Sequence, residues 1–330
     1  MYVVSFIDFA LYLAYFPKLI SGPLERWRRF LPQLTGSRRV DNAAIAHSLA
    51  LIGLGLFRAV VLAGMLTVLQ PANVLEQPEA HTALELFMGI GAFMIYLYNQ
   101  FAGYTDIVRG VSGLFGIELS RNFAQPFFSQ DFSDFWRRWH ISLSQWLRDY
   151  IYMPLSRALL RRNPSRTNIP NLILPPLVTM LISGLWHGAS WHVILWGLLN
   201  GCYIMLENLI NLFRPARPGV KTPAWRRVLS SVVVLGLAML AVVPFYLDLR
   251  DSFVFFYQSL FAWRWQAVSL WPLAIVGFSL LLDGAQYRTD DEVFILRLPW
   301  WAQSIALALL MVAVVVVEQL QSAPAMFVYP

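Results

Sequence analysis

The chain alternates long apolar runs with short polar stretches, and most of the runs are as long as a membrane-spanning helix. About 20 consecutive apolar residues cross the hydrocarbon layer of a bilayer as an α-helix. The runs that satisfy this length lie near residues 44–69, 83–104, 169–186, 191–213, 228–247 and 300–317. Residues 6–21 and 270–283 form shorter runs, so the pattern predicts six or seven crossings. Residues 252–263 predict a short aromatic helix at the interface.

Prolines interrupt one of these runs near its beginning. Pro170, Pro175 and Pro176 all lie in the first half of residues 169–186. Because proline removes a backbone donor and clashes with the preceding turn, we expect this part of the helix to be kinked or broken.

A long stretch between the second and third spans, residues 108–168, has no run of membrane length. Its central part, residues 131–155, has a helical period and predicts one amphipathic helix that ends at Pro154. The apolar side would carry Phe132, Phe135, Trp136, Trp139, Leu143, Trp146, Leu147 and Tyr150. A helix so rich in tryptophan is expected at the membrane surface or in a groove of a helical bundle.

Composition and charge agree with a membrane protein. Of the 330 residues, 58% are hydrophobic and only 13% are charged, whereas soluble domains contain about 25% charged residues. The net charge of +6 comes mostly from arginines in short loops, which indicates cytoplasmic loops and argues against binding of nucleic acid. The single cysteine, Cys202, excludes a disulfide within the chain. With no repeat or soluble segment visible, residues 1–330 predict one all-α polytopic domain.

The candidate chemistry centres on two histidines. His187 lies at the end of an apolar run, between Trp186 and Gly188, in the segment Ser183-Gly184-Leu185-Trp186-His187-Gly188-Ala189. An imidazole at membrane depth usually faces a bundle interior or a water-filled cavity, although a histidine that only caps the helix remains an alternative. Gly184 and Gly188 allow another backbone or a ligand to approach closely.

His140 lies towards the apolar side of the predicted amphipathic helix, and packing against a backbone carbonyl is the alternative to a functional role. We assign no function to His47 or His81, and we interpret His192 as a flanking residue. No carboxylate or thiol lies at ligand spacing around His187 and His140, so the sequence predicts no metal site. Neither a G-x-S-x-G elbow nor a P-loop is present. Imidazole titrates near neutral pH, which suits a general base that takes the proton of a hydroxyl.

Five stretches together resemble the membrane-bound O-acyltransferase family, and in particular its bacterial alginate O-acetyltransferase-like subgroup. They cover most of residues 6–200 in the family's order: Tyr15-Phe16-Pro17 with Ser21-Gly22-Pro23; Phe101-Ala102-Gly103-Tyr104-Thr105-Asp106; Asp134-Phe135-Trp136-Arg137-Arg138-Trp139-His140-Ile141-Ser142-Leu143; Leu147-Arg148-Asp149-Tyr150-Ile151-Tyr152-Met153-Pro154-Leu155; and Ser183-Gly184-Leu185-Trp186-His187-Gly188. Family members usually carry further spans before the point that corresponds to Met1, so we expect N-terminal spans to be missing here.

The resemblance implies a bundle with re-entrant and interfacial helices around a tunnel, in the inner membrane of a bacterium. It implies O-acyl transfer, most simply O-acetyl transfer, from a cytoplasmic thioester to a hydroxyl of an exported polysaccharide or of a periplasmic partner protein. The donor would be acetyl-coenzyme A or an acyl carrier protein, with no tightly bound cofactor. His187 aligns with the catalytic histidine of the family, and His140 with its second characteristic histidine. The substrate-binding residues would be Trp186, Trp139, Ser183, Gly184, Gly188, Arg137 and Arg138.

Three alternatives stay open at this point. D-alanylation of teichoic acid uses a related membrane protein that shares both histidine motifs. A transporter or lipid flippase would use the histidines as a proton relay, and broken helices would suit it. A non-catalytic scaffold would follow if the missing N-terminal helices were needed for activity.

Overall fold

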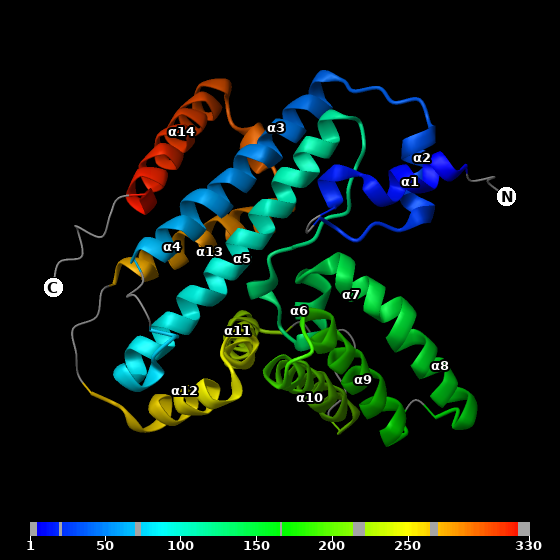
Figure 1. Cartoon of the computed structure of the whole chain (residues 1–330), viewed down its shortest axis with the longest axis vertical. Helices are drawn as coiled ribbons and strands as arrows, with labels where there is room; N and C mark the ends of the chain where they lie inside the picture. The colour runs from blue at the N-terminus through cyan, green and yellow to red at the C-terminus, as the bar shows by residue number, and fades with distance from the viewer. Residues whose placement is uncertain are drawn as a thin grey trace. The chain divides into compact units, whose positions relative to one another are not determined.

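The computed structural model describes residues 5–19, 22–69, 74–165, 167–213, 222–264 and 270–322, and its regular elements there are helices (Figure 1). Six of these helices are long and apolar enough to cross a membrane: Asn42–Val68, Ala83–Leu114, Ile169–His187, Trp191–Phe213, Ala224–Tyr246 and Trp300–Gln321. The predicted all-α polytopic class is therefore confirmed. Ser21, which belongs to the first of the family-like stretches, lies outside the described residues. The same holds for four basic residues of the predicted cytoplasmic loops: Arg166, Arg214, Arg217 and Lys221.

The chain divides into two compact units, each assembled from separate stretches of sequence. Unit 1 contains Met1–Gln70, Ile95–Asn122 and Ser269–Pro330, and unit 2 contains Pro71–Met94 and Phe123–Val268. Helix α5 contributes its first residues to unit 2 and the remainder to unit 1. The single domain expected from the sequence stays a prediction.

Unit 1 contains α1 to α4, most of α5, α13 and α14. The helices are α1 (Phe6–Ala14), α2 (Trp27–Thr35), α3 (Asn42–Leu56), α4 (Ala63–Leu69), α5 (Ala83–Leu114), α13 (Trp271–Thr289) and α14 (Trp300–Ser322). A π-helical segment, η2 (Phe57–Leu62), joins α3 to α4, so that the three form one continuous span. A Cβ added to Gly103 of α5 would lie 2.6 Å from the carbonyl oxygen of Gly55. Small residues thus let α3 and α5 pack with their backbones in close contact.

A buried polar network holds the interior of unit 1 together. Arg58 of η2 donates to Asp283 of α13 at 2.5 Å and to Asn99 of α5 at 3.2 Å, and both partners are fully buried. Gln286 accepts from Arg58 at 3.0 Å and donates to the carbonyl oxygen of Glu292 at 2.8 Å. A charge inside a membrane helix is costly to leave unpaired, so these contacts compensate Arg58.

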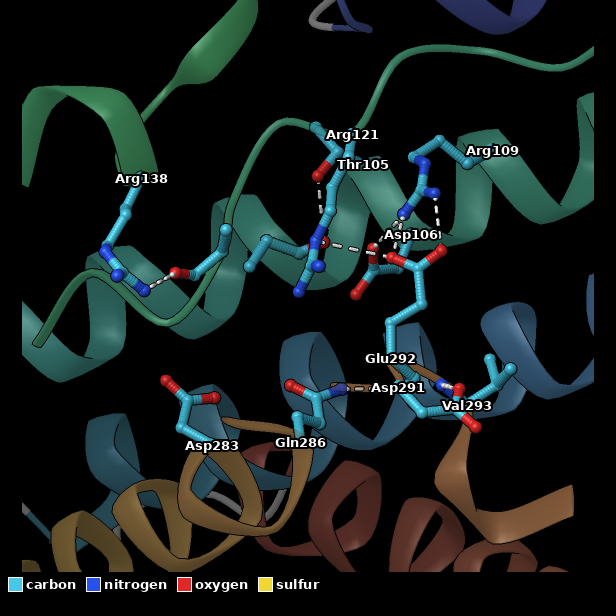
Figure 2. A network of polar contacts seen from close by, with 12 residues as sticks. Thr105, Asp106, Arg109, Arg121, Arg138, Asp283, Gln286, Asp291, Glu292 and Val293 are labelled. Carbon is cyan, nitrogen blue, oxygen red and sulfur yellow. Dashed lines mark hydrogen bonds and ion pairs between the residues drawn. The ribbon is translucent and has the colours of Figure 1, made fainter. Parts of the chain in front are cut away.

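The network continues outward to Glu292, whose carboxylate lies between two arginines in Figure 2. Arg109 donates to both Glu292 oxygens, at 2.7 and 2.9 Å, and Arg121 lies 3.4 Å away. Although burial raises the pKa of Glu292, the hydrogen bonds and charges of Arg109 and Arg121 hold that pKa below its ordinary value. Glu292 is therefore ionised and fixes the loop after α13 to α5.

Unit 2 contains the helices that carry both candidate histidines. They are α6 (Phe132–Arg138), α7 (Ile141–Leu147), α8 (Met153–Arg162), α9 (Ile169–His187), α10 (Trp191–Phe213), α11 (Ala224–Tyr246) and α12 (Leu249–Phe261). Helices α9 and α10 lie side by side (green in Figure 1). A Cβ on Gly184 of α9 would lie 2.7 Å from the carbonyl oxygen of Val193 at the start of α10. Gly184 therefore serves close helix packing.

The sequence predicted a kink or a break at these prolines, and the break is wrong, because α9 is continuous from Ile169 to His187. Pro176 has no N–H for the carbonyl oxygen of Leu172, one turn earlier. The side chain of Asn208 in α10 donates to that oxygen at 3.1 Å. A neighbouring helix thus supplies the missing donor, as membrane helices with internal prolines require.

The single amphipathic helix expected over residues 131–155 is also wrong. Helix α6 ends at Arg138, and α7 begins at Ile141 after a break at Trp139 and His140. The carbonyl oxygen of Arg138, which would accept from Ser142 in a continuous helix, accepts instead from the backbone N–H of Ala124 at 2.9 Å. The segment before α6 therefore takes over the bond that would have joined the two helices.

The helical path also does not end at Pro154, contrary to expectation. A π-helical segment, η5 (Arg148–Tyr152), follows α7, and Pro154 then lies in the first turn of α8, which continues to Arg162. Proline is tolerated in the first turn of a helix. In a regular α-helix, the missing N–H of Pro154 would interrupt the hydrogen bonding one turn earlier. Here that turn belongs to η5, which has π-helical hydrogen bonding.

Candidate active site

His187 lies at the C-terminal end of α9, where the chain turns towards α10. Gly188 is the residue that ends the helix, and its N–H donates to the carbonyl oxygen of Gly184 at 3.2 Å. A Cβ at Gly188 would meet only ordinary contacts, at 3.7 and 3.8 Å. A side chain at Gly188 would therefore fit, whereas Gly184 has no room for one because of its contact with α10.

Two aromatic rings hold the imidazole of His187. The ring centroid of Trp196 on α10 and that of Phe245 on α11 each lie 5.3 Å from that of His187, both in edge-to-face geometry. Trp196 and Phe245 also contact each other at 5.1 Å. His187 itself is exposed, so its ring is oriented by its neighbours and still accessible. The sequence analysis did not select Phe245 for the site, because it lies 58 positions from His187 on another helix.

His140 has an unusual backbone conformation. Its φ of 43° and ψ of 54° lie in the left-handed region. Non-glycine residues rarely adopt this region, and such strain concentrates at functional sites. His140 is the N-cap residue of α7, and its carbonyl oxygen accepts from the backbone N–H of Ser144 at 3.0 Å.

His140 and His187 interact electrostatically. Burial lowers the pKa of His140 to about 3, and the charge of His187 acts in the same direction. His140 is therefore neutral at physiological pH, and it is suited to hydrogen bonding rather than to carrying a charge. The structure thus places the two histidines that the sequence singled out near each other.

This low pKa predicts that the protein loses stability in acid. The unfolded chain protonates His140 near pH 6.5, but the folded chain protonates it only near pH 3. Between these values the unfolded state binds more protons, so stability falls as the pH falls, by at most about 1.4 kcal/mol per pH unit. Thermal unfolding in detergent at pH 7 and pH 4.5 should show a smaller acid loss for His140→Gln than for the wild type. Equal losses in the two proteins would contradict the assignment.

The predicted tryptophans occupy different environments. Trp139 is buried, stacks on Phe135 at 5.6 Å and meets Phe123 edge-to-face at 5.2 Å. Trp186 is half exposed, and its ring lies 5.6 Å from that of Trp146. Trp139 is thus part of the core that supports the break before His140. A substrate-binding role for either residue stays a prediction.

The two predicted arginines also differ. Arg138 donates to Asp134 at 2.9 Å and to the carbonyl oxygen of Ala124 at 3.3 Å. Arg137 is largely exposed and lies 3.4 Å from the Asp134 carboxylate. Arg138 therefore reinforces the connection between α6 and Ala124, while Arg137 remains accessible to solvent.

Two buried donors near the histidines lack partners. Ser183 lies one turn before His187 on α9 and is 1% exposed. Its Oγ has no hydrogen-bond partner in the described part of the chain, and neither has the buried Nε1 of Trp136 on α6. The sequence analysis selected Ser183 as a substrate-binding residue, whereas it placed Trp136 in the apolar stripe and in the stretch around His140 without giving it a role. His192, which flanks the site, has its Nδ1 3.0 Å from the carbonyl oxygen of Pro244.

Metal ligation is not indicated by the side chains that the structure describes, since none of them form a group of three or more histidine, cysteine or acidic residues. The arrangement instead offers an accessible imidazole, a second neutral imidazole and two unsatisfied donors. The two imidazoles suit proton abstraction.

Comparison with known proteins identifies several relatives that are similar to this chain in sequence. The probable alginate O-acetylase AlgI of Azotobacter vinelandii is 36% identical over 209 residues, which cover 63% of this chain and 40% of the relative. The peptidoglycan O-acetyltransferase of Helicobacter pylori is 35% identical over 198 residues, covering 59% of this chain and 36% of the relative. The teichoic acid D-alanyltransferase of Streptococcus thermophilus is 27% identical over 259 residues, covering 74% and 62%.

The chain spans about two fifths of the length of the alginate and peptidoglycan relatives. The model of a single family, described as MBOAT, membrane-bound O-acyltransferase family, matches residues 1–247 and so covers both histidine motifs. This match confirms the resemblance predicted from the sequence. The chain belongs to the membrane-bound O-acyltransferase family.

Proposed function

We propose that the protein transfers an acyl group, specifically an acetyl group, from a thioester to a hydroxyl. The observation that carries the proposal is the accessible imidazole of His187, oriented by Trp196 and Phe245 and within electrostatic range of His140. A positioned imidazole is the commonest general base in proteins. The site would lie in the inner membrane of a bacterium, in line with the six apolar helices and the bacterial relatives.

In the proposed reaction, His187 accepts the proton of the acceptor hydroxyl. The hydroxyl oxygen attacks the thioester carbon, and a C–O bond forms. The C–S bond then breaks, and the departing thiolate takes the proton from His187, so that an ester and a free thiol result. His140, which is neutral, would orient the acceptor or hold His187 in place.

Donor and acceptor follow from chemistry and from the relatives. The donor is a cytoplasmic thioester, either acetyl-coenzyme A or an acyl carrier protein, and the acceptor is an exported polysaccharide or a periplasmic partner protein. Two relatives are named for O-acetylation, of alginate and of peptidoglycan, and they are 36% and 35% identical to this chain. The relative named for D-alanyl transfer is 27% identical. The greater identity supports O-acetyl transfer to a glycan over D-alanylation.

Membranes that contain the protein should transfer radiolabel from [acetyl-¹⁴C]acetyl-coenzyme A into a base-labile ester on a soluble uronic-acid polysaccharide. Membranes from the same host without the protein provide the control. A D-alanyl thioester serves as the competing donor. Label transferred from D-alanine but not from acetate would replace the proposal by D-alanylation, and no transfer from either donor would overturn acyl transfer by this chain.

A further inference from the structure

One part of unit 2 carries a strong excess of positive charge. Between Asp149 and Asp248 the only acidic residue is Glu207, whose carboxylate accepts from the backbone N–H of Ser133 at 3.1 Å. The same stretch contains nine basic residues: Arg157, Arg161, Arg162, Arg166, Arg214, Arg217, Lys221, Arg226 and Arg227. None of them lies within α9 or α10. The positive charge of this stretch is therefore not neutralised within it.

The ends of the helices α9, α10 and α11 place these residues at one end of unit 2. Asn208 in α10 donates to the carbonyl oxygen of Leu172 in α9 at 3.1 Å, so the last turns of α10 lie beside the first turns of α9. At the opposite end, His192 in the first turn of α10 contacts the carbonyl oxygen of Pro244, near the end of α11, at 3.0 Å. Helix α11 therefore begins at the end of unit 2 where α9 begins. The described arginines there are Arg157, Arg161, Arg162, Arg226 and Arg227, which we call the basic end.

The segment that follows α8 is fastened to the beginning of α9. The side chain of Asn171, in the first turn of α9, donates to the carbonyl oxygens of Asn163 and Ser165 at 3.0 and 2.7 Å. Since α9 is a candidate membrane span, these bonds keep the C-terminal end of α8 at the level where that span begins. Three of the arginines of the basic end thus lie at the expected height of the lipid headgroups.

Helix α8 is amphipathic. Arg157 and Arg161 are four residues apart, so they share one face of the helix, and both are exposed. Leu155 and Leu159 occupy the opposite face and are partly buried. A short helix with arginines on one face and leucines on the other is suited to lie in the membrane interface.

The arginines of the basic end lack the carboxylates that other exposed arginines have. Arg29 lies 3.6 Å from the carboxylate of Glu118, and Arg297 lies 2.7 Å from that of Asp291. Among the residues that the structure describes, no ion pair includes an arginine of the basic end. An anion from outside the chain could therefore bind there without displacing an internal partner.

A tryptophan beside the arginines indicates which kind of anion this is. Trp225 begins α11 with Ala224, is 62% exposed, and has its ring 5.2 Å from the guanidinium of Arg226. Tryptophans are enriched at the headgroup level of membranes. A cluster of four to eight basic residues next to a span or on an amphipathic helix is typical of binding to anionic lipids. These observations favour a membrane surface over an acidic soluble protein.

We propose that the basic end binds the phosphate groups of anionic phospholipids in the leaflet where α9 begins. The planar guanidinium group donates two parallel hydrogen bonds to phosphate oxygens, which suits arginine better than lysine to this contact. The lipid would hold α8 and the first turns of α9 and α11 at the membrane surface. This interaction goes beyond the proposed acyl transfer and does not depend on it.

The double variant Arg157→Gln/Arg161→Gln tests the proposal on the full chain in nonionic detergent. Native mass spectrometry measures the affinity for added phosphatidylglycerol, and phosphatidylcholine serves as the neutral comparison. We expect the wild type to prefer phosphatidylglycerol and the variant to bind it about 25-fold more weakly, since each basic residue near an anionic surface contributes about fivefold. Arg226→Gln/Arg227→Gln tests the same surface without altering α8 and should weaken the affinity similarly.

The control variant Arg29→Gln/Arg297→Gln removes the same charge from arginines that already have carboxylate partners. It should leave the affinity for phosphatidylglycerol within about twofold of the wild type. Unfolding temperatures in the same detergent verify that all variants are folded. Equal affinities of the wild type for the two lipids, or equal losses in the control and in both test variants, would overturn the proposal. Weaker binding of coenzyme A or of an acidic carrier protein, with unchanged binding of phosphatidylglycerol, would also overturn it and assign the basic end to a soluble partner.

Discussion

Replacing His187 by glutamine is expected to lower acyl transfer by about 10²- to 10⁴-fold, the range that general bases contribute. Glutamine keeps the polarity of the side chain and much of its volume but takes up no proton. The chain should stay folded, because His187 is exposed. Initial rates with labelled acetyl-coenzyme A and unfolding temperatures in detergent would separate chemistry from folding.

His192 provides a matched control in the same unit. It lies five residues after His187, and its imidazole contacts the carbonyl oxygen of Pro244. His192→Gln should therefore keep most of the activity. In a His187→Gly variant, added imidazole should restore part of the transfer, because a diffusible base can occupy the vacated space. Equal losses in the His187 and His192 variants, with no rescue, would assign a structural role to His187.

Arg58→Met is expected to destabilise the protein by about 3–5 kcal/mol, because it leaves a buried carboxylate without its partner. Arg58 and Asp283 are 2% and 0% exposed, and their oppositely charged atoms are 2.5 Å apart. Asn99 and Gln286 would also lose a donor. The double variant Arg58→Met/Asp283→Leu should recover part of the loss, since it removes the unpaired carboxylate but leaves Asn99 and Gln286 without the donor.

The exposed pair formed by Arg297 and Asp291 is the control for this comparison. Its charged atoms are 2.7 Å apart, but the Arg297 side chain is 60% exposed. Arg297→Met should cost less than about 1 kcal/mol. The free energies of unfolding of the four proteins, measured by denaturant titration in mixed micelles, test the difference. Similar losses in Arg58→Met and Arg297→Met would show that burial does not strengthen the inner pair.

Much of the fold could be predicted from the sequence because membrane spans depend on local composition. The six apolar runs correspond to the six candidate spans, and the short aromatic helix expected near residues 252–263 is α12. Two of the three errors depend on partners elsewhere in the chain. The bond from Ala124 to the carbonyl oxygen of Arg138 breaks the helix before His140. The bond from Asn208 to Leu172 allows α9 to pass its prolines. Hydrophobic periodicity and the rules for proline consider one segment at a time, so they could predict neither of these two hydrogen bonds.

Site residues that belong to a sequence motif could be predicted, but residues that reach the site through packing of another helix could not. His187 and His140 stand out as histidines in apolar surroundings and match the family's motifs. Phe245 became part of the site only through α11. From the sequence, Gly184 could allow the close approach of either another backbone or a ligand. The structure shows that it is the backbone of α10.

The buried pair of Arg58 and Asp283 also has a consequence for biosynthesis. The two residues are 225 positions apart. At a translation rate of about 5–20 residues per second, Arg58 emerges from the ribosome roughly 10–45 s before its counter-ion. The helix with Arg58 must therefore enter the bilayer with an uncompensated cation, at a cost of about 2.5–3.5 kcal/mol at the centre of the membrane. Until Asp283 follows, this segment depends on the insertion machinery or on the hydrogen bond from Arg58 to Asn99.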